Sequence, residues 1–296
     1  EALVGFGTRH TLSETRSDTR GIGAARRWTQ RQFEAMSRDC GGCLTIATPS
    51  DTVTGPRVPV PTEVVDVLAI QRGTGDPNRV IIISGHIDSV LSGEEQGLLG
   101  GKILADYATA QGWQVEANLN NDIVGNSEGQ SGVRDTTRVR VFSEGTKTVE
   151  TAAQAERRRY NGGEVDSSSR NLARFIDGIA DRYLTNFDVE LIYRTDRYGR
   201  GGDQVEMLRA GFPAVRVSEG AENYDRQHQD LRTEDGVVYG DTIEGVDFDY
   251  LGQVARLDIV SMGALASAPS VPTGVTIAGA VKPDTTLSWT AVPGAA

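Results

Sequence analysis

Long apolar runs are missing from this chain of 296 residues. No stretch approaches the roughly 18–20 consecutive apolar residues that a membrane-spanning helix needs, so we expect no membrane partner. Basic residues are also too few for a broad cationic surface: 30 Lys and Arg stand against 41 Asp and Glu, which gives a formal net charge of −11. Such a charge repels phosphate backbones, so we expect no nucleic-acid partner.

Cysteine is nearly absent, since the chain has one pair only, Cys40 and Cys43 in a Cys-Gly-Gly-Cys segment. One pair cannot complete a tetrahedral zinc site. Because the pair follows an expected helix, a thioredoxin-type redox motif is disfavoured. A short-loop disulfide in an exported protein and two free thiols at a helix end both stay open. The chain begins at Glu1 without the basic segment and apolar core of a signal peptide, so we expect a mature or trimmed form.

The sequence does contain alternating strand and helix patterns. Hydrophobic residues make up 38% and charged residues 24%, as in globular proteins with a real core. The β-branched run at 80–83 predicts a strand buried on both faces of a parallel sheet. The residues at 65–69 predict a half-buried strand after a polar, Pro-rich stretch at 48–62. Further strands are expected at about 115–124, 138–142, 189–193 and 213–217, and helices at about 18–38, 98–111, 170–184, 203–210 and 248–265. This order predicts an α/β fold with a mostly parallel central sheet flanked by helices.

The composition changes near the end of the chain. A Ser-Ala-Pro-Ser-Val-Pro linker follows Ala266, and two short strands are expected at 275–277 and 286–289. Such a short segment cannot bury a core of its own. It resembles the start of a fibronectin type III module, so we expect one main domain over residues 1–268 and a linker with a truncated β segment over 269–296. The polar stretch at 143–166 is typical of a surface insertion that can form part of a substrate rim.

Histidine is scarce, with only His10, His86 and His228, and His86 stands where chemistry would need it. It follows the expected strand at 80–83, in the segment His86-Ile87-Asp88. In parallel α/β sheets, ligands bind outside the carboxyl ends of the strands. A histidine there with an acidic residue two positions on fits a metal ligand whose second ring nitrogen is held by a carboxylate. A surface histidine beside an unrelated aspartate is the alternative.

Carboxylates at two further positions could complete a metal site. Glu94 and Glu95 stand together in Gly-Glu-Glu-Gln-Gly, which is electrostatically awkward unless a cation or proton is shared between them. A hydrolytic metal site needs one carboxylate as ligand and another as general base. Asp122 ends an expected strand and offers a hard oxygen ligand, and His228 lies in a polar loop two residues before Asp230. Each residue alone also fits an ordinary solvated loop.

The joint order of these residues is more specific than any one of them. His-x-Asp, then Gly-Glu-Glu, then a strand-end Asp and a late His resembles the two-zinc exopeptidases, the family of the bacterial leucyl aminopeptidases and the glutamate carboxypeptidase catalytic domain. The segments at 93–100 and 7–11 are similar to that family's base-and-ligand segment and to the opening of its secreted bacterial members. The resemblance spans about residues 3–265. It implies a zinc peptidase domain with a phosphorylase/hydrolase-like sandwich, acting on peptide substrates in a secreted or periplasmic setting; the oligomeric state is not indicated.

The resemblance also implies two zinc ions and a role for each residue. His86 and Asp122 would bind one ion, and Glu95 and His228 would bind the other. Glu94 would be the general base, and Asp88 would orient His86. The implied activity is that of a zinc-dependent aminopeptidase, in which a metal-activated water attacks the first peptide bond while the free N-terminus of the substrate lies against the acidic site.

One departure from the family pattern separates the alternatives. The family has an Asp that bridges both zinc ions between His-x-Asp and Gly-Glu-Glu, followed by a helix and a strand. Here only Ser89 to Gly93 separate Asp88 from Glu94, so no bridging Asp can be assigned. A parallel crossover needs roughly a dozen residues. Either the printed sequence omits a segment or the deletion is real, and a real deletion favours a non-catalytic pseudoenzyme or binding module of the same fold. A zinc carboxypeptidase or another amidohydrolase is a further alternative.

Overall fold

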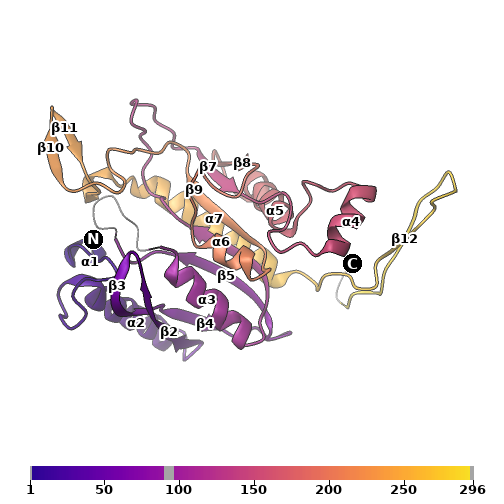
Figure 1. The fold of residues 1–296 in the computed structure, drawn as a ribbon, viewed down its shortest axis with the longest axis horizontal. Coiled ribbons are helices and arrows are strands. Elements are labelled where there is room, and N and C mark those ends of the chain that lie inside the picture. Colours follow the sequence, from indigo (N-terminus) through magenta and orange to yellow (C-terminus); the bar gives the residue numbers. More distant parts are fainter. Residues whose placement is uncertain (1, 90–96, 294–296) are drawn as a thin grey trace.

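A five-stranded sheet forms the centre of the molecule in the computed structural model, which describes residues 2–89 and 97–293 (Figure 1). Its strands lie in the order β5 (Arg79–Gly85), β6 (Gln114–Asn121), β9 (Ala214–Glu219), β7 (Arg138–Phe142) and β8 (Asp188–Ile192). The pairs β5–β6, β6–β9 and β7–β8 are parallel, and β7–β9 is antiparallel. The predicted α/β fold with a mostly parallel sheet is therefore confirmed.

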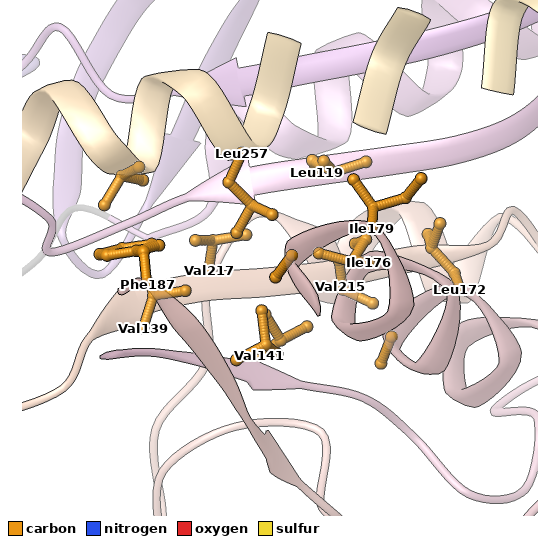
Figure 2. Close-up of a cluster of buried hydrophobic side chains, with 14 of the residues drawn as sticks. Leu119, Val139, Val141, Leu172, Ile176, Ile179, Phe187, Val215, Val217 and Leu257 are labelled. Atoms are coloured by element: carbon orange, nitrogen blue, oxygen red, sulfur yellow. The ribbon is translucent and has the colours of Figure 1, made fainter. Parts of the chain in front are cut away.

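Helices cover both faces of this sheet. On one face lie α5 (Ser168–Tyr183) and α7 (Phe248–Ser267), and on the other lie α3 (Leu99–Ala110) and α6 (Gln204–Arg209). Leu119, Val141 and Val217 point from the strands toward α5 and α7 and pack with Ile176 and Leu257 in the larger buried cluster (Figure 2). Alternate residues of the same strands point to the α6 face, and near the carboxyl ends of β6 and β9 these residues are polar.

The N-terminal part of the chain packs below this sheet in Figure 1. It contains α1 (Ala2–Gly5), α2 (Gly21–Asp39), β1 (Leu44–Ala47) and β4 (Leu68–Gln71), with β1 and β4 antiparallel. The polar, Pro-rich stretch at 48–62, for which no strand was expected, contains β2 (Ser50–Gly55) and the start of β3 (Val58–Val65), which form a hairpin. Proline is compatible with a two-stranded hairpin, in which each strand has an outer edge that needs no donor. The strand expected at 65–69 is instead divided between β3 and β4.

The burial expected for the run at 80–83 was wrong. The strand exists as β5 and is parallel to β6, but it lies at the end of the strand order. Its residues are at most partly buried, and Ile83 is 38% exposed. A β-branched run predicts strand structure well, but it does not distinguish a central strand from an edge strand.

The remaining elements lie at the periphery. Within the segment at 143–166, α4 (Ala152–Asn161) starts at a capping box formed by Thr151 and Gln154 and has no buried residue, as expected of a surface insertion. The pairs β10 (Arg232–Glu234) with β11 (Val237–Tyr239) and β12 (Thr276–Ala278) with β13 (Thr286–Ser288) are small antiparallel hairpins, and η1 (Ile243–Gly245) precedes α7. A fibronectin type III start at β12–β13 and the domain boundary at 268 stay predictions.

Two further expectations can be compared with the structure. Cys40 and Cys43 form a disulfide just after α2, so they are not free thiols. None of the helices built from the described residues is both long enough and apolar enough to cross a membrane.

Candidate metal and catalytic site

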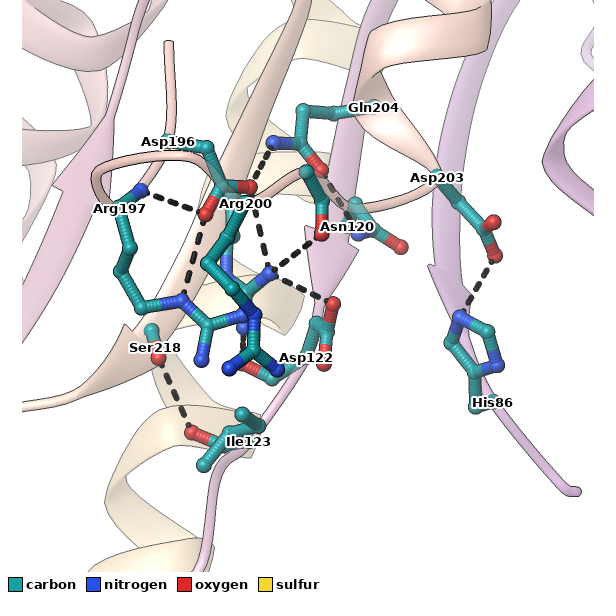
Figure 3. A network of polar contacts seen from close by, with 12 residues as sticks. His86, Asn120, Asp122, Ile123, Asp196, Arg197, Arg200, Asp203, Gln204 and Ser218 are labelled. Atoms are coloured by element: carbon teal, nitrogen blue, oxygen red, sulfur yellow. Dashed lines mark hydrogen bonds and ion pairs between the residues drawn. The ribbon is translucent and has the colours of Figure 1, made fainter. Parts of the chain in front are cut away.

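His86 lies directly after β5 and is held between two carboxylates (Figure 3). Its Nδ1 is 2.7 Å from Asp88 Oδ1, and its Nε2 is 3.1 Å from Asp203 Oδ2. Partial burial of the ring lowers its pKa, but the hydrogen bonds to Asp203 and Asp88 outweigh this effect and raise the pKa of His86 well above its ordinary value. The contact expected between His86 and Asp88 is therefore present, and this position favours positive charge.

Asp122 lies directly after β6, the strand next to β5. Gly85 and Asn121 are register partners in the two strands, so His86 and Asp122 emerge from neighbouring carboxyl ends of the sheet. Asp122 Oδ2 is 2.7 Å from Nη1 of the fully buried Arg216 on β9. Burial raises the pKa of Asp122, although the positive charge of Arg216 opposes this shift. The aspartate expected at a strand end is therefore part of a buried ion pair.

His228 lies in the loop between β9 and β10, in a left-handed backbone conformation with φ of 54°. Its Nε2 is 3.1 Å from Nη2 of Arg200. Because a guanidinium only donates hydrogen bonds, Nε2 must be the ring nitrogen that carries the lone pair. That is the form of histidine that binds a metal ion.

One loop, residues 200–203, links these three side chains. Arg200 contacts His228, and Asp203 contacts His86. Between them, Gly202 lies against Asp122, since a Cβ on this glycine would be 2.9 Å from Asp122 Oδ2. A side chain at position 202 would therefore displace the carboxylate. The three predicted ligands that the structure describes thus surround a single loop at the carboxyl ends of β5, β6 and β9.

Negative charge is concentrated beside His86. Asp66, between β3 and β4, and Asp203 both lie close to the first turn of α3. A Cβ on Gly100 would be 2.8 Å from Asp66 Oδ1, and a Cβ on Gly101 would be 2.7 Å from Asp203 Oδ1. Burial and the nearby Asp203 raise the pKa of Asp66 to about 7. Asp66 Oδ2 and Asp203 Oδ1 are buried and have no hydrogen-bond partner among the described residues. Such a group of carboxylates is stabilised by a cation.

The imidazole of His86 and the carboxylates around it therefore fit zinc, which binds imidazole nitrogen and carboxylate oxygen. Within residues 2–89 and 97–293, no three His, Cys, Asp or Glu side chains converge closely enough to hold a metal ion. Glu94 and Glu95, the predicted base and ligand, lie outside the described residues. The ligand and base assignments stay predictions.

Sequence reasoning missed Asp203, Asp196 and Arg216. Asp203 had a local signal, because it follows the glycines at 201 and 202, which permit close approach of other groups. Arg216 had one too, as a charged residue inside the otherwise apolar strand at 213–217. Asp196 had none, because its contacts with Gln204 and Arg216 depend on how the loop before α6 lies against β9.

Comparisons with known proteins agree with this fold. A probable zinc metalloprotease of Leptosphaeria maculans is 39% identical to this chain over 333 residues, covering 97% of this chain and 77% of the relative. The aminopeptidase LapA of Legionella pneumophila has a similar structure, with a TM-score of 0.57 and 15% identity over 90% of this chain and 67% of LapA. A glutaminyl cyclase of Fimbriiglobus ruber has a TM-score of 0.56 and 13% identity over 90% of this chain and 92% of the cyclase. At such low identities these two structures show the fold alone. No protein-family model matches the chain.

Proposed function

Since this chain belongs to the family of the probable zinc metalloproteases, we propose that it is an aminopeptidase that removes N-terminal residues from peptides. The observation that carries the proposal is the loop at 200–203, which contacts His86, Asp122 and His228. The carboxylates of Asp88 and Asp203 beside His86 support the exopeptidase assignment, because the free ammonium group of a peptide would stabilise their charged forms. We also propose that the protein acts outside the cytoplasm, which the Cys40–Cys43 disulfide supports.

In this proposal the residues of the chain have distinct tasks. His86 and Asp122 would hold one zinc ion, and Glu95 and His228 a second. Asp88 holds Nδ1 of His86, so Nε2, which lies 3.1 Å from Asp203 Oδ2 in this structure, is the ring nitrogen that would bind the ion. Bound zinc would supply Lewis acidity toward water and the scissile carbonyl. Glu94 would accept the water proton on its carboxylate and deliver it to the leaving amine.

The direct test is metal content measured together with cleavage of a set of peptides. We expect zinc in the purified protein, cleavage of an aminoacyl anilide, and no cleavage of the same compound with an acetylated N-terminus. Release of C-terminal residues instead would favour the carboxypeptidase alternative. For a peptide with N-terminal glutamine, the product mass distinguishes hydrolysis from cyclisation. Zinc without turnover of any of these substrates would contradict the peptidase assignment.

A non-catalytic binding module is the second candidate. It is favoured by the short connection from Ser89 to Gly93, which leaves no position for a bridging carboxylate. The alignment with the Leptosphaeria maculans relative runs over 333 residues, more than the 296 of this chain, so the relative has residues without a counterpart here. Catalytic zinc sites normally have three protein ligands per ion. About two zinc ions per chain would support catalysis, and none would support the binding module.

The two histidines outside the β5 segment should differ in their effect on zinc. We expect His228→Ala to lower the zinc content per chain and His10→Ala to leave it nearly unchanged. His228 contacts the loop at 200–203 through Arg200, whereas Nδ1 of His10 accepts a hydrogen bond of 3.2 Å from the Leu12 N–H. Zinc analysis of both purified variants measures this. An equal loss in the two variants would contradict the assignment of His228 as a ligand.

A further inference from the structure

Arg216 is an unusual residue for the middle of a sheet. It lies on β9, between β6 and β7, and its side chain is 0% exposed. Its Nη1 is 2.7 Å from Asp122 Oδ2, and its Nη2 donates a hydrogen bond of 3.3 Å to the backbone oxygen of Asp122. Burying a charged pair costs desolvation free energy that the pairing rarely exceeds. Arg216 is therefore better explained by what it does to Asp122 than by stability.

A second layer of polar contacts fixes the guanidinium. Asp196 Oδ2 is 3.2 Å from Arg216 Nη1 and accepts a hydrogen bond of 2.7 Å from Gln204 Nε2. Gln204 in turn accepts a hydrogen bond of 3.2 Å from Asn120 Nδ2, and Asn120 is the register partner of Arg216 in the sheet. Figure 3 shows Asp196, Gln204 and Asn120 grouped beside Asp122. This network restricts Arg216 to one orientation.

The backbone beside Asp122 is constrained by the same strand. Ile123 has φ of 60°, which is costly for a β-branched residue. Its carbonyl oxygen accepts hydrogen bonds from the Glu219 N–H at 2.9 Å and from Ser218 Oγ at 3.3 Å, both at the end of β9. Strand β9 thus holds both the Asp122 side chain and the strained residue that follows it. Gly202 lies against the guanidinium as well, since a Cβ added to this glycine would be 3.0 Å from Arg216 Nη1.

We propose that Arg216 is a positioning residue, which engages Oδ2 of Asp122 so that this carboxylate binds zinc through Oδ1 in one fixed orientation. The inference rests on the proposed function, because it takes Asp122 as a ligand. It adds Arg216 to the site as a residue that acts through Asp122 and is not expected to contact the metal or the substrate. Residues that orient metal ligands typically change metal affinity about 10–100-fold when they are replaced.

Zinc affinity, measured by competition with a chromophoric chelator, tests this role without relying on turnover. We expect Arg216→Met to raise the zinc Kd about 10–100-fold and Arg216→Lys to recover part of the loss. The matched control is Arg170→Met. Arg170 is also buried, at 1% exposed, but it bonds Ser143 and stacks on Tyr193 instead of contacting Asp122. This control should leave the zinc Kd within about twofold of the parent.

The outcomes separate this inference from the proposed function. A parent protein that binds no zinc overturns both. Tight zinc binding and peptidase activity in the parent, with equal zinc Kd values for Arg216→Met and Arg170→Met, overturn the positioning role alone. If Arg216→Met does not fold, Asp196→Asn replaces it, since this substitution keeps the shape of the side chain and removes its charge next to Nη1. An unchanged zinc Kd in that variant would equally overturn the positioning role.

Discussion

Replacing Glu94 by Gln is expected to abolish turnover while leaving the bound zinc in place. The general base of a hydrolytic site accepts the proton of the attacking water, and losing such a base typically costs roughly 10²–10⁴ in rate. Gln keeps the size of the side chain but cannot accept that proton. Measuring kcat and kcat/KM with an aminoacyl anilide, together with zinc per chain by atomic absorption, gives both quantities from one preparation.

The neighbouring variant Glu95→Gln is the matched control for this prediction. As a ligand, Glu95 should affect zinc content first, and activity should fall in proportion to the metal lost. Full zinc content in Glu95→Gln, with zinc lost from Glu94→Gln, would show that the two roles are reversed. Unchanged kcat in Glu94→Gln would remove Glu94 from the mechanism.

The second large effect concerns stability and pH. Glu219 at the end of β9 is 2% exposed, and burial raises its pKa to about 8 from 4.5, although hydrogen bonds from the backbone N–H and the side chain of Asn126 oppose this shift. Between these two pH values the folded state binds more protons at this site than the unfolded chain, so the free energy of unfolding falls as pH rises. At about 1.4 kcal/mol per pKa unit, the loss reaches several kcal/mol by pH 8 and then levels off.

We therefore expect Glu219→Gln to be more stable than the parent protein above pH 8 and similar to it near pH 4.5. Gln stays neutral at every pH, so it avoids the cost of a buried charge. Urea unfolding at pH 5 and pH 9 measures the difference. Glu190→Gln, at an exposed position of β8, serves as control and should change stability by less than about 0.5 kcal/mol at either pH. Parallel pH curves for Glu219→Gln and the parent would contradict the prediction.

Local patterns in the sequence predict most of the central fold. The β-branched run of β5 and the serine cap of α5, where Ser167 accepts a hydrogen bond from the Arg170 N–H, depend on residues close together in the chain. The β2–β3 hairpin escaped prediction because β2 is mostly polar and β3 contains two prolines, so only the cross-strand pairing reveals them. The exposure of Ile83 depends on the strand order, which no local pattern contains.

The candidate site shows the same division. His86 and Asp88 could be paired from the sequence because they stand two residues apart, and their contact is present. Arg216 and Asp122 are separated by 94 positions and meet only because β9 pairs with β6. Asp203, which contacts His86, lies in the loop before α6. This loop has no hydrophobic periodicity from which the position of Asp203 could be predicted. Contacts that depend on strand order and loop paths are therefore the part that sequence reasoning could not supply.

The disulfide after α2 closes a very small ring, because Cys40 and Cys43 are three positions apart. The chain entropy that a cross-link removes from the unfolded state grows with the length of the loop it closes, so a ring this short contributes only about 2 kcal/mol. Domains of ordinary stability have about 5–15 kcal/mol. Opening this bond would therefore leave the central sheet folded, and its effect would be confined to the turn after α2.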